Sequence, residues 1–245
     1  MTAFAPARTD LEFRKVTAHI GAEVVGLDLK AELDEPTVAA LRGGLNEHKV
    51  LVFRHVHLED GDQTRFARSF GELTAAHPTV PSIKGEPNVL AVDSEDGVVS
   101  NHWHTDVTFV VNPPQLSTLR SLVLPPYGGE TLIANAAAAY QSLPDALRRL
   151  ADELWAVHSN VYDYSRASLA KLDDEARAHY EQFISIEYET VHPVVRVHPL
   201  SGERGLFIGG FARHIQGLSE SVAAARIAEH ELWFAREDGF AVDAR

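Results

Sequence analysis

The amino-acid sequence predicts a mixed α/β protein with a mainly β core, folded as a barrel or jelly roll. Two observations support this prediction. Many short segments are rich in β-branched and aromatic residues and are separated by turn residues, and a few helical segments lie between them. The chain has 245 residues, of which 45% are hydrophobic, which is enough for one sizeable core. We therefore expect a single domain over residues 11–245, after a flexible leader over residues 1–10.

The first third of the chain alternates between strands and helices. Residues 11–29 contain β-branched residues and glycine turns, and they predict short strands. Residues 35–48 predict a helix, with a proline in its first turn and an apolar stripe. The compact apolar run at 49–54 predicts a buried strand, and residues 62–70 predict a second amphipathic helix.

The middle of the chain predicts further strands between proline- and glycine-rich turns. We expect these strands at residues 89–92, 103–110, 115–124 and 131–133. Asn135 is a suitable N-cap for the alanine-rich helical stretch that follows it.

The alanine-rich stretch reaches Leu154 and should be divided near Pro144. Residues 162–188 are polar and charged, and we expect a lid-like excursion there, part of it a helix over 173–183. After this excursion, we expect strands at 191–198 and 205–208 and a helix at 219–237.

Composition excludes several classes of function. The net charge is -13, from 35 acidic and 22 basic residues, which argues against nucleic acid or an anionic membrane as the partner. The absence of cysteine excludes disulfides, thiolate metal sites and cysteine nucleophiles. No signal peptide is visible at residues 1–10, and no apolar run reaches the ~18 residues of a membrane span. We expect a cytoplasmic protein.

The H-x-D pair formed by His104 and Asp106 is the candidate metal site. On a strand, these two side chains would project from the same face. Together they supply two of the three ligands of the 2-His-1-carboxylate triad that holds non-haem Fe(II). His102 would lie about 13 Å from Asp106 along such a strand, so it is not expected to share the ion. It is assigned to the substrate pocket or to the structure.

Four motifs carry a family resemblance. They are N-H-W-H-T-D-V-T-F at 101–109, L-P-P-Y-G-G-E-T-L at 124–132, N-A-A-A-A-Y at 135–140 and H-P-V-V-R-V-H-P at 192–199. Their succession resembles the TauD/TfdA family of Fe(II)- and 2-oxoglutarate-dependent dioxygenases, and within it the taurine dioxygenase and alkylsulfatase branch. The resemblance implies a double-stranded β-helix, a cupin-like jelly roll, flanked by helices.

The resemblance also implies roles for individual residues. His104 and Asp106 would bind Fe(II), and the Thr131 hydroxyl would bind the distal carboxylate of 2-oxoglutarate. His77 would contact the sulfonate or sulfate head of the substrate, and Val107 would line the substrate pocket. By contrast, His158, His192, Arg196 and His198 receive no chemical role from the sequence.

The implied reaction consumes O₂ and 2-oxoglutarate and hydroxylates the carbon next to a sulfonate or a sulfate ester. The hydroxylated product gives an aldehyde and sulfite or sulfate, alongside succinate and CO₂. Taurine dioxygenase has an aromatic residue at the position of Val80, so we expect a more apolar substrate, such as an alkyl sulfate. The resemblance further implies a homodimer or homotetramer.

The sequence departs from the family pattern at its C-terminal end. The family places its third iron ligand and an anion-binding arginine in a W-D-N-R-x-x-x-H segment, which is absent here. We therefore expect an incomplete jelly roll and weak or no oxygenase activity. The chain could be truncated or frame-shifted, it could be a naturally short relative, or His214 or His230 could replace the third ligand. The alternative function is a catalytically impaired relative that serves only in binding or assembly. A zinc hydrolase is a third class, but no H-E-x-x-H motif supports it.

Overall fold

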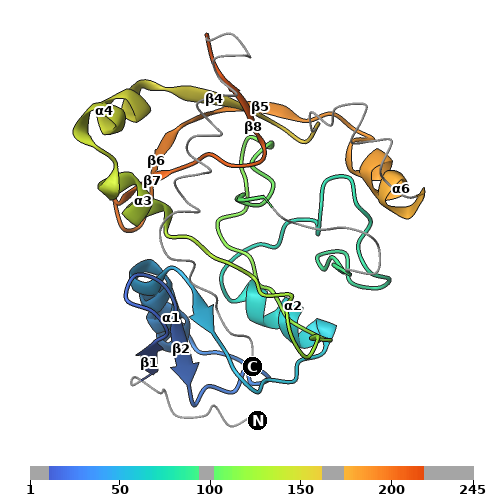
Figure 1. Ribbon diagram of the computed structural model, residues 1–245. Coiled ribbons are helices and arrows are strands. Elements are labelled where there is room, and N and C mark those ends of the chain that lie inside the picture. The colour runs from blue at the N-terminus through green and yellow to red at the C-terminus, as the bar shows by residue number, and fades with distance from the viewer. Residues whose placement is uncertain (1–10, 94–101, 162–173, 218–245) are drawn as a thin grey trace.

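The computed structural model describes residues 11–93, 102–161 and 174–217. Figure 1 shows an N-terminal unit, a sheet at the opposite end of the molecule, and a long coil between them. No described helix has the length and apolar character needed to cross a membrane.

The N-terminal unit combines a small sheet with two helices. Strands β1 (Glu12–Lys15) and β2 (Ala22–Val25) are antiparallel, and β3 (Leu51–Val52) pairs in parallel with β2. Helices α1 (Glu35–His48) and α2 (Asp60–Arg68) complete the unit. All five elements lie within the predicted segments or overlap them, although β3 is shorter than the predicted strand.

Local chemistry sets the ends of α1. The Asp34 carboxylate accepts a hydrogen bond of 2.9 Å from the Thr37 amide, which satisfies one of the free N–H groups of the first turn. Lys49 ends the helix in a left-handed conformation, with φ 67°. The helix buries one face in a core whose fully buried members are Val24, Leu29, Leu41 and Phe66.

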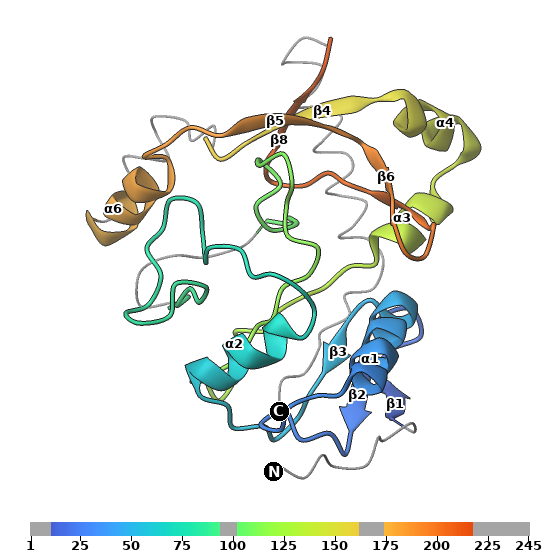
Figure 2. The same ribbon diagram turned by 180° about the vertical axis from the view of Figure 1, so that it is seen from behind.

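The opposite sheet has the order β5-β4-β8 and is antiparallel throughout. Its strands are β4 (Trp155–Ser159), β5 (Glu189–Pro193) and β8 (Ala212–Ile215). Next to it, β6 (Val195–Val197) and β7 (Arg204–Leu206) form an antiparallel two-stranded sheet. Figure 2 shows both sheets from behind.

Three helices surround the sheet. Helices α3 (Ala136–Ser142) and α4 (Asp145–Glu153) lie at one end, and α6 (Asp174–Phe183) lies at the other. As predicted, Asn135 caps α3, by accepting from the amides at 137 and 138, and the two helices are divided at Pro144. A second core joins α3, α4 and the strands, and its buried members include Tyr140, Leu143, Ala156, Val195, Leu206 and Ile215.

Three predicted strands are absent from the described coil. Residues 89–92, 103–110 and 115–124 contain no strand, and 131–133 contains only a single bridge at Leu132. Within 103–110 the chain turns, because Val107 has φ 55° and the Val110 amide donates to its carbonyl at 3.2 Å. A left-handed residue cannot continue an extended strand.

The coil over 115–124 is held by α2 through side chains. Gln63 Nε2 donates to the Thr118 carbonyl at 3.1 Å, and Arg120 binds both the Asp60 carboxylate and the Leu58 carbonyl. These polar contacts explain how the segment is fixed without strand pairing.

Two strands were missed by the prediction, and one was predicted too long. Strand β4 directly follows α4 without a glycine turn, and β8 lies where sequence indicated a loop. The predicted strand over 191–198 is divided into β5 and β6 at Val194, whose amide bonds the Leu154 carbonyl. The predicted strand at 205–208 and the predicted helix at 173–183 are confirmed, within one or two residues, as β7 and α6.

The described residues thus form a mixed fold of small sheets and flanking helices, with no closed jelly roll among them. The predicted leader at 1–10 and the helix at 219–237 lie outside the described residues, as do residues 162–173 of the expected lid.

Candidate metal centre

The two predicted ligands lie side by side. His104 Nε2 is 3.3 Å from Asp106 Oδ1, and both side chains are partly exposed. The strand that was expected to bring them together is absent, so this part of the prediction was wrong. A turn that begins at Asp106 instead folds the carboxylate toward the imidazole.

Both ring nitrogens of His104 face oxygen acceptors. Nδ1 lies 2.9 Å from the carbonyl oxygen of His102, so this nitrogen carries the proton of a neutral ring. Nε2 would then direct a lone pair at the Asp106 carboxylate. This arrangement requires a proton or a cation between the two groups.

The electrostatics of the pair follow from this contact. The hydrogen bond to Asp106 raises the pKa of His104 above its usual value, against an opposing effect of burial. The same hydrogen bond lowers the pKa of Asp106. The Ser117 hydroxyl and a positive charge on His77 act in the same direction, and burial opposes them.

The donor set fits two positions of a metal ion. Ligand bonds of about 2.1 Å at right angles place two donor atoms about 3.0 Å apart, close to the separation observed here. The carbonyl on Nδ1 is the outer partner that metal-binding histidines require, because it fixes the ring and its tautomer. His104 and Asp106 could therefore hold Fe(II) together.

Contacts from two other segments fix the pair. Ser117 Oγ donates to Asp106 Oδ2 at 3.1 Å. The Phe211 ring packs edge-on against His104, with ring centres 5.7 Å apart. The Gly210 amide donates to the Trp103 carbonyl at 2.8 Å. The turn before β8 is therefore bonded to residues 103–110, which we call the metal segment.

A positive charge on His77 would lower the pKa of Asp106, so the two side chains interact electrostatically, and the substrate contact predicted for His77 stays a prediction. The Nδ1 of His77 accepts the backbone amides of Thr79 at 3.2 Å and Val80 at 3.1 Å. The proton of a neutral ring is therefore on Nε2. Val107, directly after Asp106, is half-buried and has the left-handed φ given above.

An aromatic wall continues from His77, and sequence reasoning missed it. Phe109 is 1% exposed and packs edge-on against Phe183 of α6, at 5.9 Å, and against Phe211, at 5.0 Å. The ring centres of His77 and Phe183 are 5.1 Å apart, and those of Tyr188 and Phe109 are 6.0 Å apart. Phe109 belongs to the motif and could have been selected; the others come from distant segments and carry no local signal.

Thr131 is exposed in coil, and no described hydrogen bond links it to His104 or Asp106. Its predicted role with 2-oxoglutarate therefore stays a prediction.

No third ligand joins the pair within the described residues. There, no group of three or more His, Cys, Asp or Glu side chains could hold a metal ion. His214 lies on β8 opposite Val157, and not in a loop as predicted. His230 lies outside the described residues.

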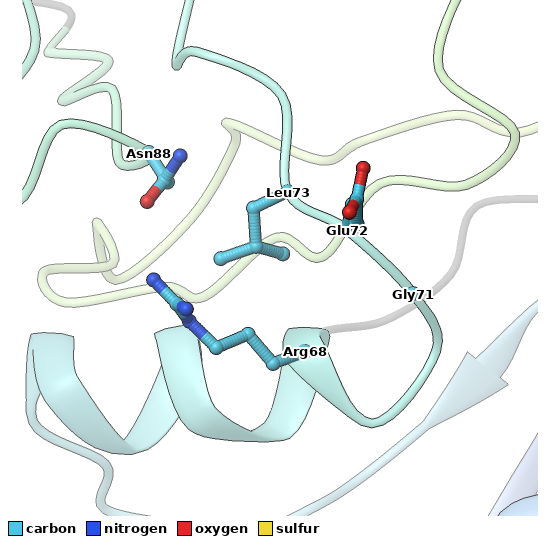
Figure 3. A pocket seen from close by; sticks show the side chains of 5 residues that line it. All are labelled: Arg68, Gly71, Glu72, Leu73 and Asn88. Carbon is cyan, nitrogen blue, oxygen red and sulfur yellow. The ribbon is translucent and has the colours of Figure 1, made fainter.

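A separate open hollow lies at the C-terminal end of α2 (Figure 3). Its lining residues are Arg68, Gly71, Glu72, Leu73 and Asn88. None of the residues predicted for the metal site lines it.

The chain resembles characterised enzymes over most of its length. It is 51% identical over 220 residues to an alpha-ketoglutarate-dependent sulfate ester dioxygenase of Pseudomonas putida, which covers 89% of this chain and 72% of that protein. It is 44% identical over 223 residues to an alkylsulfatase of Acinetobacter baylyi, covering 90% and 70%.

Solved structures agree. A taurine dioxygenase of Burkholderia xenovorans superimposes with a TM-score of 0.76 at 32% identity, covering 96% of this chain and 77% of that one. The family described as "Taurine catabolism dioxygenase TauD, TfdA family" matches residues 12–238. The chain therefore belongs to the TauD/TfdA family of dioxygenases.

Proposed function

We propose that the protein is an Fe(II)- and 2-oxoglutarate-dependent dioxygenase that cleaves sulfate esters, with an alkyl sulfate as the substrate. The reaction converts the ester, 2-oxoglutarate and O₂ into an aldehyde, sulfate, succinate and CO₂. The observation that carries the proposal is the His104–Asp106 pair, in which both imidazole nitrogens face oxygen acceptors. The similarity to a sulfate ester dioxygenase and an alkylsulfatase selects the substrate class.

In this proposal, His104 and Asp106 would hold Fe(II), and Ser117 fixes the carboxylate of Asp106. Bound Fe(II) and 2-oxoglutarate, with O₂, supply the oxidising power to hydroxylate the carbon beside the ester oxygen. Thr131 is the proposed donor to the distal carboxylate of 2-oxoglutarate. The hydroxylated carbon then releases sulfate to leave the aldehyde.

The residues beyond the metal suit an alkyl sulfate. His77 is the proposed contact for the anionic head, and its Nδ1 accepts backbone amides, so the proton of a neutral ring is on Nε2. Val107 and Phe183 are half-buried and offer an apolar surface for an alkyl chain, and the buried rings of Phe109 and Phe211 pack behind Phe183. Taurine, which carries a charged amine, would leave that charge against apolar rings.

The similarity to named enzymes favours catalysis over the alternative of a binding or assembly protein. We also infer that the core of this protein follows the double-stranded β-helix of its family, since the structural relatives are dioxygenases of this family. A homodimer or homotetramer is proposed on the same ground.

The test measures binding and turnover in sequence. Isothermal titration should show Mn(II) and 2-oxoglutarate binding together to the wild type and not to Asp106→Asn. With Fe(II), O₂ and hexyl sulfate, the wild type should form succinate and hexanal in equal amounts, at the low rate expected without the W-D-N-R-x-x-x-H segment, and more slowly or not at all with taurine. Succinate formation no faster than that of Asp106→Asn would contradict the proposed function.

A further inference from the structure

We propose that two buried histidines, His158 and His192, are positioning residues that hold the segment directly after Asp106 and thereby aim its carboxylate. The contacts are independent of any bound metal, but their consequence for Asp106 rests on the proposed function. The sequence assigned neither histidine a chemical role.

Hydrogen bonds join both histidines to the metal segment. His158 Nδ1 lies 2.9 Å from the Thr108 hydroxyl, and both side chains are almost fully buried. His192 Nε2 lies 3.1 Å from the Val110 carbonyl. Since a carbonyl only accepts, Nε2 of His192 carries the proton. The segment is thus bonded at the second and fourth residues after Asp106.

Strand pairing places the two rings on one face of the sheet. His158 lies on β4 and His192 on β5, and the register pairs Ala156 with His192 and His158 with Thr190. The two histidines are therefore diagonal neighbours, as i and j±2 positions are. Their rings meet edge to face at 5.3 Å. Two neighbouring strands of a rigid sheet thus present one histidine each to the coil.

The surroundings keep both rings neutral. Burial lowers the pKa of His158 to about 4, and the neighbouring His192 and Arg196 act in the same direction, because a second proton there would be repelled. Burial also lowers the pKa of His192, although the Val110 and Thr108 carbonyls oppose it. A neutral ring has one N–H and one lone pair, so each histidine can make a directed bond without bringing a charge toward Asp106.

The segment they hold is strained. Val107 lies between Asp106 and Thr108 with φ 55°, a conformation that β-branched residues rarely adopt. Such residues persist only where the surrounding structure holds them in place. The hydrogen bonds to Thr108 and Val110 supply this restraint on the C-terminal side of Val107.

His158 is not placed there for stability alone. Its Nε2 is buried and has no hydrogen-bond partner among the described residues. A buried polar atom without a partner is destabilising, and a leucine of similar size would remove it. The benefit of histidine at this position is therefore the bond from Nδ1 to Thr108.

The test measures amide hydrogen exchange over residues 107–110 in the metal-free full-length protein. His158→Leu and His192→Leu should speed this exchange at least tenfold, relative to the amides of α1 in the same sample. His158→Asn and His192→Gln keep a polar nitrogen at the bonding position and should restore slow exchange. His198→Leu, which removes an exposed histidine just after β6, is the matched control and should leave the segment unchanged.

A second readout is Mn(II) affinity, followed by the electron paramagnetic resonance of free Mn(II). Partners of this kind change metal affinity by about 10–100-fold, so the leucine variants should bind Mn(II) at least tenfold more weakly and the Asn and Gln variants should recover. Unchanged exchange in the leucine variants, or unchanged affinity despite faster exchange, would overturn the positioning role alone. A wild type that does not bind Mn(II) would overturn the proposed function and the positioning role with it.

Discussion

At the scale of single residues, the direction of one carboxylate decides what the site can bind. Asp106 has one oxygen toward His104 and the other toward Ser117. A carboxylate held at both oxygens loses little freedom when a metal binds, which favours affinity. The hydroxyl of Ser117 is therefore as much a part of the site as the two predicted ligands.

Replacing Ser117 with alanine should weaken Mn(II) binding about tenfold, because Asp106 Oδ2, the oxygen that faces away from His104, loses its described hydrogen-bond donor. Titration calorimetry measures this change. Ser142→Ala is the control, since the Ser142 Oγ donates to the carbonyl of Ala139 in its own helix and to no other described residue. Equal affinities of the two variants would show that Ser117 does not orient the carboxylate.

At the scale of elements, glycine determines how closely two segments approach. The turn before β8 crosses the metal segment at Gly209, where an added Cβ would lie 2.6 Å from the Trp103 carbonyl oxygen and 3.0 Å from His104 Cα. Both atoms belong to the backbone, which cannot move aside easily. Any side chain at this position would displace the metal segment.

Gly209→Ala should therefore lower the free energy of unfolding by about 1–3 kcal/mol and weaken metal binding as well. Gly210→Ala is a matched control, because its Cβ would come no closer than 3.5 Å to any atom, an ordinary contact. Urea unfolding of both variants checks the prediction. Similar losses at the two positions would show that the close approach is not what requires glycine.

Helix α1 offers a second pair of adjacent glycines. Gly43 is exposed, with no atom near the added Cβ, so Gly43→Ala should stabilise the protein by about 0.5–1 kcal/mol. Gly44 faces the core, where the Cβ would lie 2.3 Å from the Phe13 ring. Gly44→Ala should destabilise instead, as measured by thermal unfolding. Changes of the same sign would contradict the described packing of α1 against β1.

At the scale of the whole molecule, the metal segment joins parts of the protein that are far apart in the sequence. The long coil is bonded to α2 through Gln63 and to the sheet through His158 and His192. Lys49, at the end of α1, forms an ion pair of 2.5 Å with Glu203 beside β7. The free energy of unfolding of the whole protein should therefore depend on the buried residues that join these parts, such as His158.

Acidification should destabilise the folded protein through His158. Its pKa is about 4 in the folded state against about 6.5 when unfolded, so the unfolded state binds the proton first as pH falls. The stability that this neutral histidine contributes is full above pH 6.5 and is lost progressively down to about pH 4. By linkage, the loss is about 3 kcal/mol.

Urea unfolding between pH 7 and pH 4.5 measures this effect. The free energy of unfolding of His158→Leu should fall less steeply with decreasing pH than that of the wild type, because the variant lacks the titrating group. Parallel curves would mean that His158 is not buried as a neutral ring.

Local chemistry made several features predictable from sequence. Pro36, Asn135 and Pro144 marked helix boundaries through a fixed φ, a side-chain cap and a missing N–H, which depend on neighbouring residues alone. The H-x-D spacing identified His104 and Asp106 as partners, and the motifs identified the family. These signals lie within short stretches of chain.

Only the tertiary structure decided how those residues meet. Residues 103–110 form a turn and not the predicted strand, because Val107 is held left-handed by contacts from distant strands. Strand β8, the aromatic wall and the two positioning histidines were not predictable for the same reason: each depends on pairing between segments separated by many residues. Sequence alone determined the chemistry of the two proposed ligands, and long-range packing determined their geometry.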